Sequence, residues 1–374
     1  MNNSARQEYE PGTHPDLPPP VKTTGPVAWV RQNLFSSTLN TILTLLAFWF
    51  LWEILPPIFE WAVVNSIWTA GNRQECWDQM SSPALGACWA FIENRLSLFT
   101  YGFYPGHLQW RVNLSFVLLV LALIPLLYEK LPYRKYGLTY SAIFPFITGW
   151  LLVGGFGLES VDTDQFGGIM LTLILGVTGI SFSLPIGIML ALGRQSKMPV
   201  LRILCVLFIE FIRGVPLITL LFVASTMLNY FLPPGTVFDL LLRVLIMVTL
   251  FASAYMAEVI RGGLQAISKG QHEAGDSLGL TYWQANRLIV LPQALKISIP
   301  GIVNTFIGLY KDTTLVLIIG MLDLLGIGDA SLADAQWAGL ANEIYIFVAL
   351  FFFLTCFGMS RYSIYLEKKL HTGH

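Results

Sequence analysis

The sequence predicts an all-α polytopic membrane protein with about eight transmembrane helices. Of its 374 residues, 55% are apolar and only 12% are charged, whereas soluble domains average about 25% charged residues. The apolar residues gather in long runs, and a bilayer core about 30 Å thick needs about 20 such residues per helix. This composition excludes a soluble enzyme and a disordered protein. The net charge of −1 offers no basic surface for nucleic acid.

Eight apolar runs are candidate spans, and they differ in length and continuity. The second run is short, and Lys311 and Asp312 interrupt the seventh. Pro56 and Pro57 predict that the outer end of the first run is kinked or lies in the membrane interface. In chain order the runs are Thr38–Val64, Leu114–Tyr128, Ser141–Leu158, Gly168–Leu192, Leu201–Phe231, Phe238–Val259, Ile297–Gly320 and Ile344–Ile364.

Basic residues predict the orientation, because Lys and Arg are in excess in the cytoplasmic segments beside membrane spans. With the N-terminus inside, fifteen of the 22 basic residues fall in inner segments, and only Arg73, Arg95 and Arg111 fall in outer ones. Both termini are therefore expected in the cytoplasm. Residues 1–30 are Pro-rich and polar, which predicts a disordered cytoplasmic tail.

Two of the four cysteines, Cys76 and Cys88, fall in the long loop assigned to the outer side. In an oxidising compartment they can form a disulfide, which would stabilise the loop by about 3 kcal/mol in the chain-entropy model. The alternative is a pair of unrelated thiols, and the sequence leaves both open. Cys205 and Cys356 lie within spans, where a free thiol behaves as a small apolar side chain.

The inner stretch Ile260–Lys296, between the sixth and seventh spans, is the least membrane-like part of the second half of the chain. A short helix is expected over Glu273–Leu278, ended by Gly279, and a second helix from Tyr282 to Val290, ending before Pro292. Glu273 and Asp276 share one face of the first helix. The stretch is either a rigid helical projection that docks on a soluble protein or an ordinary connecting loop.

The spacing within this stretch favours the first alternative, because it resembles the coupling loop of ABC importer permeases. That family's pattern is Glu-Ala-Ala, three residues, Gly, nine residues, Ile, one residue, Leu-Pro. One position departs from it, since Gly275 stands where the second Ala is usual; the side chain stays small, although a helical Gly costs about 1 kcal/mol. The residues that the resemblance assigns to docking on an ATPase are Glu273, Ala274, Gly275, Asp276, Gly279, Ile289, Leu291 and Pro292.

The resemblance extends over residues 165–366. The segments Glu210–Leu217, Ala257–Gly263 and Lys311–Leu315 are similar to the branch of the family that imports polar amino acids. The additional N-terminal spans resemble the M-type permease of broad-specificity L-amino-acid importers. The resemblance thus implies three parts. Residues 1–30 form the tail, and residues 31–160 form an extension of about three spans with a periplasmic loop at 65–112. Residues 161–366 form a type I ABC permease domain of five spans with the coupling loop at 260–296.

This resemblance implies a transport subunit of the bacterial inner membrane that moves polar L-amino acids by alternating access. Its implied partners are a dimer of cytoplasmic ATPase subunits, a second and paralogous permease subunit, and a periplasmic amino-acid-binding protein. ATP and Mg²⁺ would bind to the ATPase, so no cofactor and no metal site are expected in this chain. The alternative is a secondary amino-acid transporter or channel-like protein without an ATPase partner.

Charged residues inside spans are costly and usually mark a pathway or a partner. Arg213, Glu258, Lys311 and Asp312 are therefore candidates for contact with an amino-acid zwitterion, which needs one acceptor and one donor. The alternative is structural pairing, and the spacing allows pairs at i, i+3 between Glu210 and Arg213 and between Glu258 and Arg261.

Two catalytic motifs appear only in part. Gly326–Asp329 matches the Gly-x-Gly-Asp pattern of intramembrane aspartyl proteases, but the chain has no Tyr-Asp pair to supply a second aspartate. His272-Glu273 lacks the second His that a zinc hydrolase requires at i+4. Asp329 belongs instead to an acidic outer stretch that is expected to face solvent or a binding protein, together with Asp323, Asp334 and Glu343.

Overall fold

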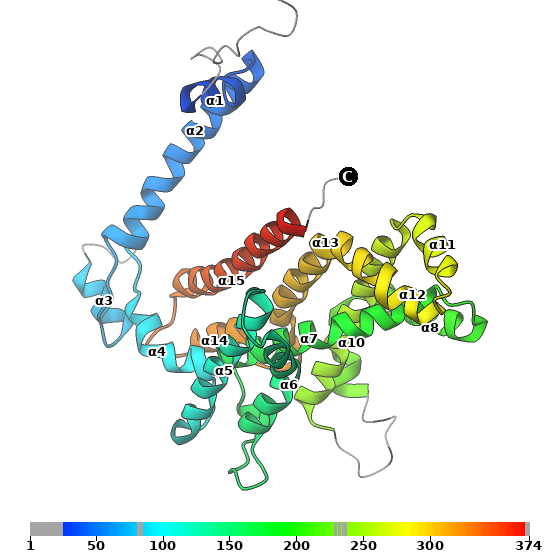
Figure 1. The fold of residues 1–374 in the computed structure, drawn as a ribbon. Coiled ribbons are helices and arrows are strands. Elements are labelled where there is room, and N and C mark those ends of the chain that lie inside the picture. Colours follow the sequence, from blue (N-terminus) through cyan, green and yellow to red (C-terminus); the bar gives the residue numbers. More distant parts are fainter. Residues whose placement is uncertain (1–24, 81–84, 228–229, 231–232, 234–237, 371–374) are drawn as a thin grey trace, which may run out of the picture. The chain divides into compact units, whose positions relative to one another are not determined.

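The computed structural model describes residues 25–80, 85–227, 230, 233 and 238–370. Two compact units divide the chain. The first comprises Met1–Ile67 with Trp77–Ala87, and the second comprises Trp68–Cys76 with Cys88–His374. Helices dominate both units, in agreement with the predicted fold class, and each unit is considered by itself below (Figure 1).

The first unit is built on the long helix α2, Thr38–Phe59, which begins where Ser37 caps its first turn by accepting a hydrogen bond from the Asn40 backbone N–H at 3.2 Å. A π-helical turn, η2 (Glu60–Val64), follows Pro56 and Pro57 without a break. A short helix, α1 (Pro26–Asn33), precedes α2. The predicted disordered tail is therefore wrong from Pro26 onward, because a Pro at the first helical position is pre-organised for a helix; residues 1–24 of that tail lie outside the described residues.

The second unit contains most of the helices, and α3 (Arg73–Gln79) crosses the boundary between the units. In chain order the others are α4 (Ala90–Tyr101), η3 (Gly106–Leu108), α5 (Gln109–Leu127), α6 (Arg134–Val153), η4 (Thr163–Gln165), α7 (Gly168–Arg194), α8 (Pro199–Gly214), α9 (Leu217–Phe222), η5 (Val223–Met227), α10 (Leu240–Gln265), α11 (Lys269–Ser277), α12 (Tyr282–Ala285), η7 (Asn286–Val290), α13 (Leu291–Asp312), η8 (Thr313–Ile319), α14 (Leu324–Ser331) and α15 (Ala341–Leu370).

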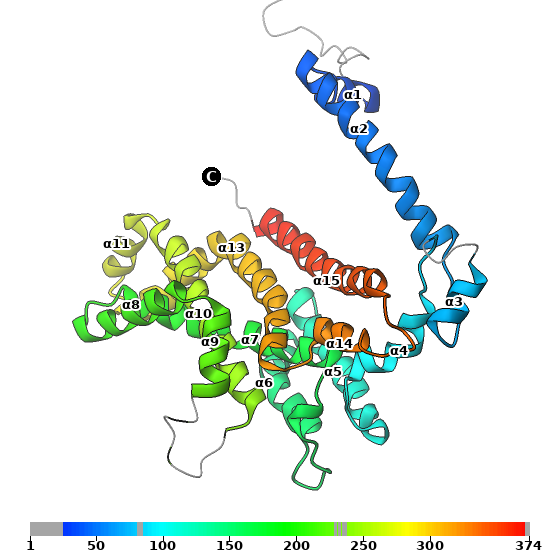
Figure 2. The same cartoon turned by 180° about the vertical axis from the view of Figure 1, so that it is seen from behind.

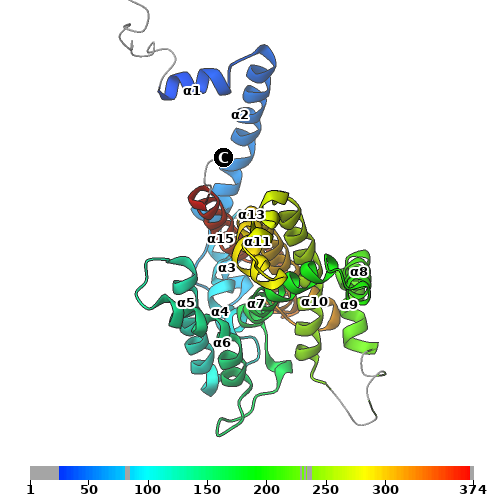
Figure 3. The ribbon, with the colours of Figure 1, turned by 45° about the vertical axis from the view of Figure 1, so that its right-hand side comes forward.

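The core of this unit is the group α7, α10 and α13, whose small residues allow close approach of the helices (Figure 3). A Cβ atom at Gly187 of α7 would lie 2.6 Å from the Met256 side chain of α10. A Cβ atom at Gly263 of α10 would lie 2.1 Å from the Ser298 hydroxyl of α13. Neither position tolerates a larger residue without a shift of the helices.

By length and apolar composition, seven helical segments of the described chain can cross a membrane, and an eighth would be the bent pair α8–α9. The predicted fifth span, Leu201–Phe231, is therefore not one straight helix: its halves bend by 103° between Gly214 and Leu217. The bend has a local cause. Pro216 forces Val215 into an extended conformation (φ −108°, ψ 131°) that no helix can continue through. Phe231, the predicted end of that span, lies outside the described residues.

Arg243 of α10 stabilises the broken span. Its guanidinium is buried and donates hydrogen bonds to the carbonyls of Ala224 (3.0 Å) and Ser225 (2.6 Å) at the end of the bent pair. Backbone carbonyls at a helix end lack intrahelical donors, and such groups are costly to bury in a membrane unless a partner satisfies them. The charge of Arg243 inside a span therefore has a structural role that the sequence did not reveal.

A disulfide joins Cys76 and Cys88, whose Cα atoms lie 6.0 Å apart. Within the second unit, the backbone N–H of Cys88 donates to the Glu343 carboxylate at 3.0 Å, and Arg95 forms an ion pair with Asp334. Two of the four acidic residues expected to face solvent are thus engaged by the segment that begins at Cys88. Glu343 is only 5% exposed, so the expectation is wrong for this residue.

Asp323 is a second exception, because it is completely buried just before α14. Its Oδ1 accepts a hydrogen bond from the Gly326 backbone N–H at 2.9 Å and so caps α14, whereas its Oδ2 has no partner. Burial raises the pKa of this carboxyl to about 6, against the lowering effect of the backbone hydrogen bonds. Asp323 therefore caps helix α14 and is not the solvated surface residue that the sequence predicted.

Candidate functional site

The loop between α10 and α13 forms two short helices, which lie at one end of the core group, away from α14 (Figures 1 and 2). Helix α11 runs over Lys269–Ser277, and Gly279 follows it with φ +69°. Glycine adopts this left-handed conformation without strain, and it is the usual way to end a helix. Gly279 therefore ends the first helix as the sequence predicted.

Helix α12 begins with a capping box. The Thr281 hydroxyl accepts from the backbone N–H of Gln284 at 3.4 Å, and the Gln284 side chain accepts from the backbone N–H of Thr281 at 2.9 Å. This reciprocal arrangement satisfies two backbone donors at the start of a helix. The turn between the two helices is thus defined by the left-handed Gly279 at its start and by the capping box of Thr281 at its end.

Gly275 and Ile289 of the sequence pattern pack the two helices together. Gly275 is buried, and a Cβ atom there would lie 3.2 Å from the Cβ of Ala285 and 3.7 Å from the Cδ1 of Ile289. Alanine would fit with a small adjustment, and any larger side chain would separate the helices. The pattern therefore requires a small residue at position 275 and an apolar one at position 289 for internal packing.

Pro292 does not end the second helix, contrary to the prediction. The helical run continues from Tyr282 to Ile319, and the π-helical turn η7 lies directly before Leu291 and Pro292. A Pro inside an α-helix clashes with the carbonyl four residues earlier, and local π-helical adjustments let helices accept it. The coupling-loop pattern thus ends in the first turn of α13, so the loop is continuous with a helical segment long enough to cross a membrane.

The outward side of the two helices combines acidic and apolar groups. Glu273 and Asp276 are exposed. Leu278 and Trp283 are 74% and 69% exposed. We call these four residues the loop face. Exposed aromatic and aliphatic side chains beside charged ones are typical of a protein-binding surface.

Five charged residues meet where α7, α8 and α10 approach each other. Glu258 of α10, whose side chain is 15% exposed, lies 2.6 Å from Arg194, 2.9 Å from Arg261 and 3.5 Å from Arg213. Glu210 of α8 lies 2.8 Å from Arg194 and 4.0 Å from Arg213. We call these residues the ion cluster. With all groups ionised it carries three positive and two negative charges.

The ion cluster contains two of the four charged residues predicted to contact substrate. Both expected i, i+3 pairs are present, Glu210 with Arg213 and Glu258 with Arg261. Arg213 also contacts Glu258, and Arg194 joins the cluster, neither of which the spacing had predicted. Arg194 is separated from Glu258 by 64 positions, so only the packing of α7 against α10 reveals their contact.

Lys311 and Asp312 lie elsewhere, at the carboxyl end of α13. A Cβ atom at Gly301 of the same helix would lie 2.7 Å from the side chain of Val259, the neighbour of Glu258. Lys311 is ten residues further along, or about 15 Å at 1.5 Å per residue. The four predicted residues therefore form two separate pairs at different levels of the helix group.

Comparison with known proteins agrees with these observations. Residues 183–372 match the family described as binding-protein-dependent transport system inner membrane component. The chain is 48% identical over 363 residues to the inner membrane amino-acid ABC transporter permease protein YhdY of Escherichia coli, covering 96% of this chain and 97% of that one. It is 47% identical over 421 residues to the glutamate/glutamine/aspartate/asparagine transport system permease protein BztC of Rhodobacter capsulatus, covering 96% of each.

A shorter relative, the probable glutamine ABC transporter permease protein GlnM of Bacillus subtilis, is 36% identical and covers 54% of this chain and 91% of its own length. The two long relatives therefore share the full architecture of this protein, whereas the shorter one matches about half of it. The chain belongs to the family of binding-protein-dependent transport system inner membrane components.

Proposed function

We propose that this chain is a permease subunit of an ATP-driven importer of polar L-amino acids, and that α11 and α12 dock on a cytoplasmic ATPase subunit. The observation that carries the proposal is the geometry of the loop. Gly275 packs closely against Ala285 and Ile289, and the exposed residues of the loop face lie on and beside the two helices that meet there. The names of the two long relatives, both amino-acid permeases, support the amino-acid substrate.

The proposal includes two further protein partners and an orientation. A periplasmic binding protein delivers the amino acid, and a second, paralogous permease completes the translocation path. The N-terminus, the loop face and the C-terminus lie in the cytoplasm, because the excess of Lys and Arg falls on that side. ATP and Mg²⁺ bind to the ATPase subunits.

A pair of variants, each with one introduced cysteine, tests the orientation. Phe156 lies between α6 and α7 and is 99% exposed, and Leu278 of the loop face is 74% exposed. In intact cells, a membrane-impermeant maleimide is expected to label Phe156→Cys and to spare Leu278→Cys until the membrane is opened. The reverse pattern would overturn the orientation and with it the docking assignment.

Substrate-stimulated ATP hydrolysis tests the coupling. The transporter is assembled in bilayer nanodiscs with its ATPase and binding protein, and hydrolysis is compared with and without substrate. The double variant Glu273→Ala, Asp276→Ala and the variant Trp283→Ala are expected to lose the stimulation. Lys269→Ala, at the start of the same helix and also exposed, is the matched control and is expected to keep it. Full stimulation in the loop-face variants would contradict the proposal.

The same preparation distinguishes the proposed importer from the alternative function, a secondary transporter or channel. It requires amino-acid flux without an ATPase partner, whereas the proposed importer requires ATP on the side of the loop face. For the charged residues, the contacts of Arg213 and Glu258 support structural pairing, and we propose Lys311 and Asp312 as the remaining candidates for contact with substrate.

A further inference from the structure

Positive charge gathers where the turn of the hairpin α5–α6 meets the end of α15. Helix α5 ends at Leu127 and α6 begins at Arg134, and both belong to segments that are long and apolar enough to span a membrane. The turn between them therefore lies at one membrane boundary. We call its basic residues, together with those that end α15, the basic patch, which comprises Lys130, Arg134, Lys135, Lys368 and Lys369.

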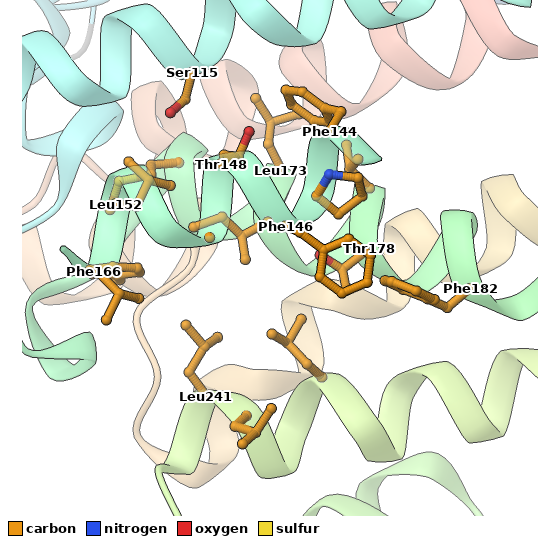
Figure 4. A pocket seen from close by; sticks show the side chains of 18 of the residues that line it. Ser115, Phe144, Phe146, Thr148, Leu152, Phe166, Leu173, Thr178, Phe182 and Leu241 are labelled. Carbon is orange, nitrogen blue, oxygen red and sulfur yellow. The ribbon is translucent and has the colours of Figure 1, made fainter. Parts of the chain in front are cut away.

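The rest of the hairpin carries no charge over the length of its two helices. Between residues 112 and 158, the charged residues are Glu129 and three members of the basic patch. The hairpin also lines a cavity of about 510 Å³ with α7 and α10, and the only polar side chains among the described lining residues are the hydroxyls of Ser115, Thr148 and Thr178 (Figure 4). The charge of the hairpin thus lies at this boundary alone.

Contacts between distant parts of the chain hold the basic patch together. Lys369 forms an ion pair with Glu129 at 2.6 Å, and its ammonium lies 5.6 Å from the centre of the Tyr365 ring. The Tyr362 hydroxyl of α15 donates to the carbonyl of Leu126 at 3.1 Å. A carbonyl at the end of a helix lacks an intrahelical donor, so this hydrogen bond fixes the end of α5 on α15. The basic residues of both segments therefore lie at the same boundary.

Most of the charge of the basic patch is not neutralised by the protein. Glu129 and Glu367 offset two of its five positive charges, which leaves a net charge of +3. Lys130, Lys135 and Lys368 are exposed, and none of them forms an ion pair with another described residue. Three ammonium groups therefore remain to attract an anionic ligand.

Exposed tyrosines surround these ammonium groups. Tyr128, Tyr133 and Tyr136 lie in the turn and the first residues of α6, and Tyr365 lies on α15. Tyrosine is enriched where a membrane meets water, because its ring suits the apolar side and its hydroxyl the polar side of the headgroup layer. The patch thus has the composition of a surface at the level of lipid headgroups, where phosphate groups are the abundant anions.

We propose that the basic patch binds the phosphate groups of anionic phospholipids at this membrane boundary. Clusters of about four to eight Lys and Arg directly beside a span are typical of anionic-lipid binding. An acidic protein segment has the same charge, but the tyrosines and the position between two spans favour a lipid. Bound phosphate would relieve the repulsion between the turn and the end of α15. In the proposed orientation the lipid belongs to the cytoplasmic leaflet, and only this choice of leaflet rests on the proposed function.

Charge variants on the two segments test the proposal independently. The double variant Lys130→Gln, Lys135→Gln alters the turn, and Lys368→Glu alters the end of α15; each lowers the net charge by two. Lys269→Glu is the matched control, because Lys269 is also exposed and its replacement also lowers the charge by two, but it lies on α11. None of these lysines forms an ion pair with a described residue, so no variant breaks an ion pair of the fold.

The probe is phosphatidylglycerol with a diazirine on its headgroup, present as a minor lipid in phosphatidylcholine nanodiscs that contain the assembled transporter. We expect photolabel on peptides of the α5–α6 turn and of the end of α15 in the wild type and in Lys269→Glu. One basic residue near an anionic surface strengthens binding about fivefold, so both patch variants should lose about tenfold or more of this label. High salt should also reduce it, because the Debye length shortens to about 3 Å at 1 M.

Four results would overturn the proposal. Equal labelling by a zwitterionic phospholipid with the same diazirine would show that the charge selects no lipid, and full labelling of both patch variants would show that the patch is not the site. Displacement of the label by soluble glycerol phosphate at constant ionic strength would assign the patch to a free phosphate. A rise in label when the ATPase is left out would assign it to a protein. The assay needs no transport activity, so any of these results leaves the proposed function intact.

Discussion

Removal of the negative charge of Glu258 is expected to destabilise the junction of α7, α8 and α10 strongly. In Glu258→Gln, the three arginines within 2.6–3.5 Å would face each other with only Glu210 to balance them. Loss of one partner from a buried ion pair costs about 3–5 kcal/mol, and the 15% exposure of Glu258 places it near the lower value. A loss of about 3 kcal/mol corresponds to a fall in Tm of roughly 6–12 °C for a domain of about 200 residues.

The assay is thermal unfolding of the purified protein in nanodiscs, followed by intrinsic fluorescence. Glu210→Gln is the matched control, because Glu210 is 53% exposed and belongs to the same cluster. Exposed ion pairs contribute at most about 1 kcal/mol and weaken with salt, so this variant should unfold within a few degrees of the wild type. Equal effects of the two substitutions would refute the view that Glu258 is the centre of the cluster.

Three further predictions concern single features of the structure. Replacement of Cys76 and Cys88 by Ser is expected to cost about 3 kcal/mol, and reductant should lower the Tm of the wild type but not that of the double variant. Gly279→Ala should reduce hydrogen-exchange protection of α11, because a left-handed conformation costs about 1–2 kcal/mol for a residue with a Cβ, whereas Gly279→Asn should be milder. Burial raises the pKa of Asp323 to about 6; the native state therefore binds its proton more tightly than the unfolded chain, so stability should rise as pH falls from 7 towards 5. Asp323→Asn should remove this pH dependence, and a wild-type stability that instead falls over that range would contradict the assignment.

The sequence predicted the features that depend on composition and local spacing. The positions of the spans followed from the lengths of the apolar runs. The end of α11 at Gly279 was predictable because the left-handed conformation of a glycine after a helix depends only on local sequence. The pairing of Glu258 with Arg261 was also predictable, since they are three residues apart on one helix.

Features that depend on packing between distant segments were not predictable. Arg194 reaches Glu258 only because α7 packs on α10, and the buried Glu343 carboxylate accepts its hydrogen bond from the distant Cys88 backbone. The effect of a proline on its helix was also not predictable from sequence. Pro216 breaks its span, whereas Pro292 is accommodated by the π-helical turn before it, and nothing in the neighbouring sequence distinguishes the two cases.

The central claim is that the loop face contacts a partner ATPase. Site-directed cross-linking tests it most directly, with a short bifunctional reagent attached at Asp276→Cys in the assembled transporter and the cross-linked peptide identified by mass spectrometry. We expect a cross-link to the ATPase subunit, and none from Phe156→Cys, which is also exposed but which the proposed orientation puts on the opposite side of the membrane. A cross-link to the ATPase from Phe156→Cys but not from Asp276→Cys would contradict it.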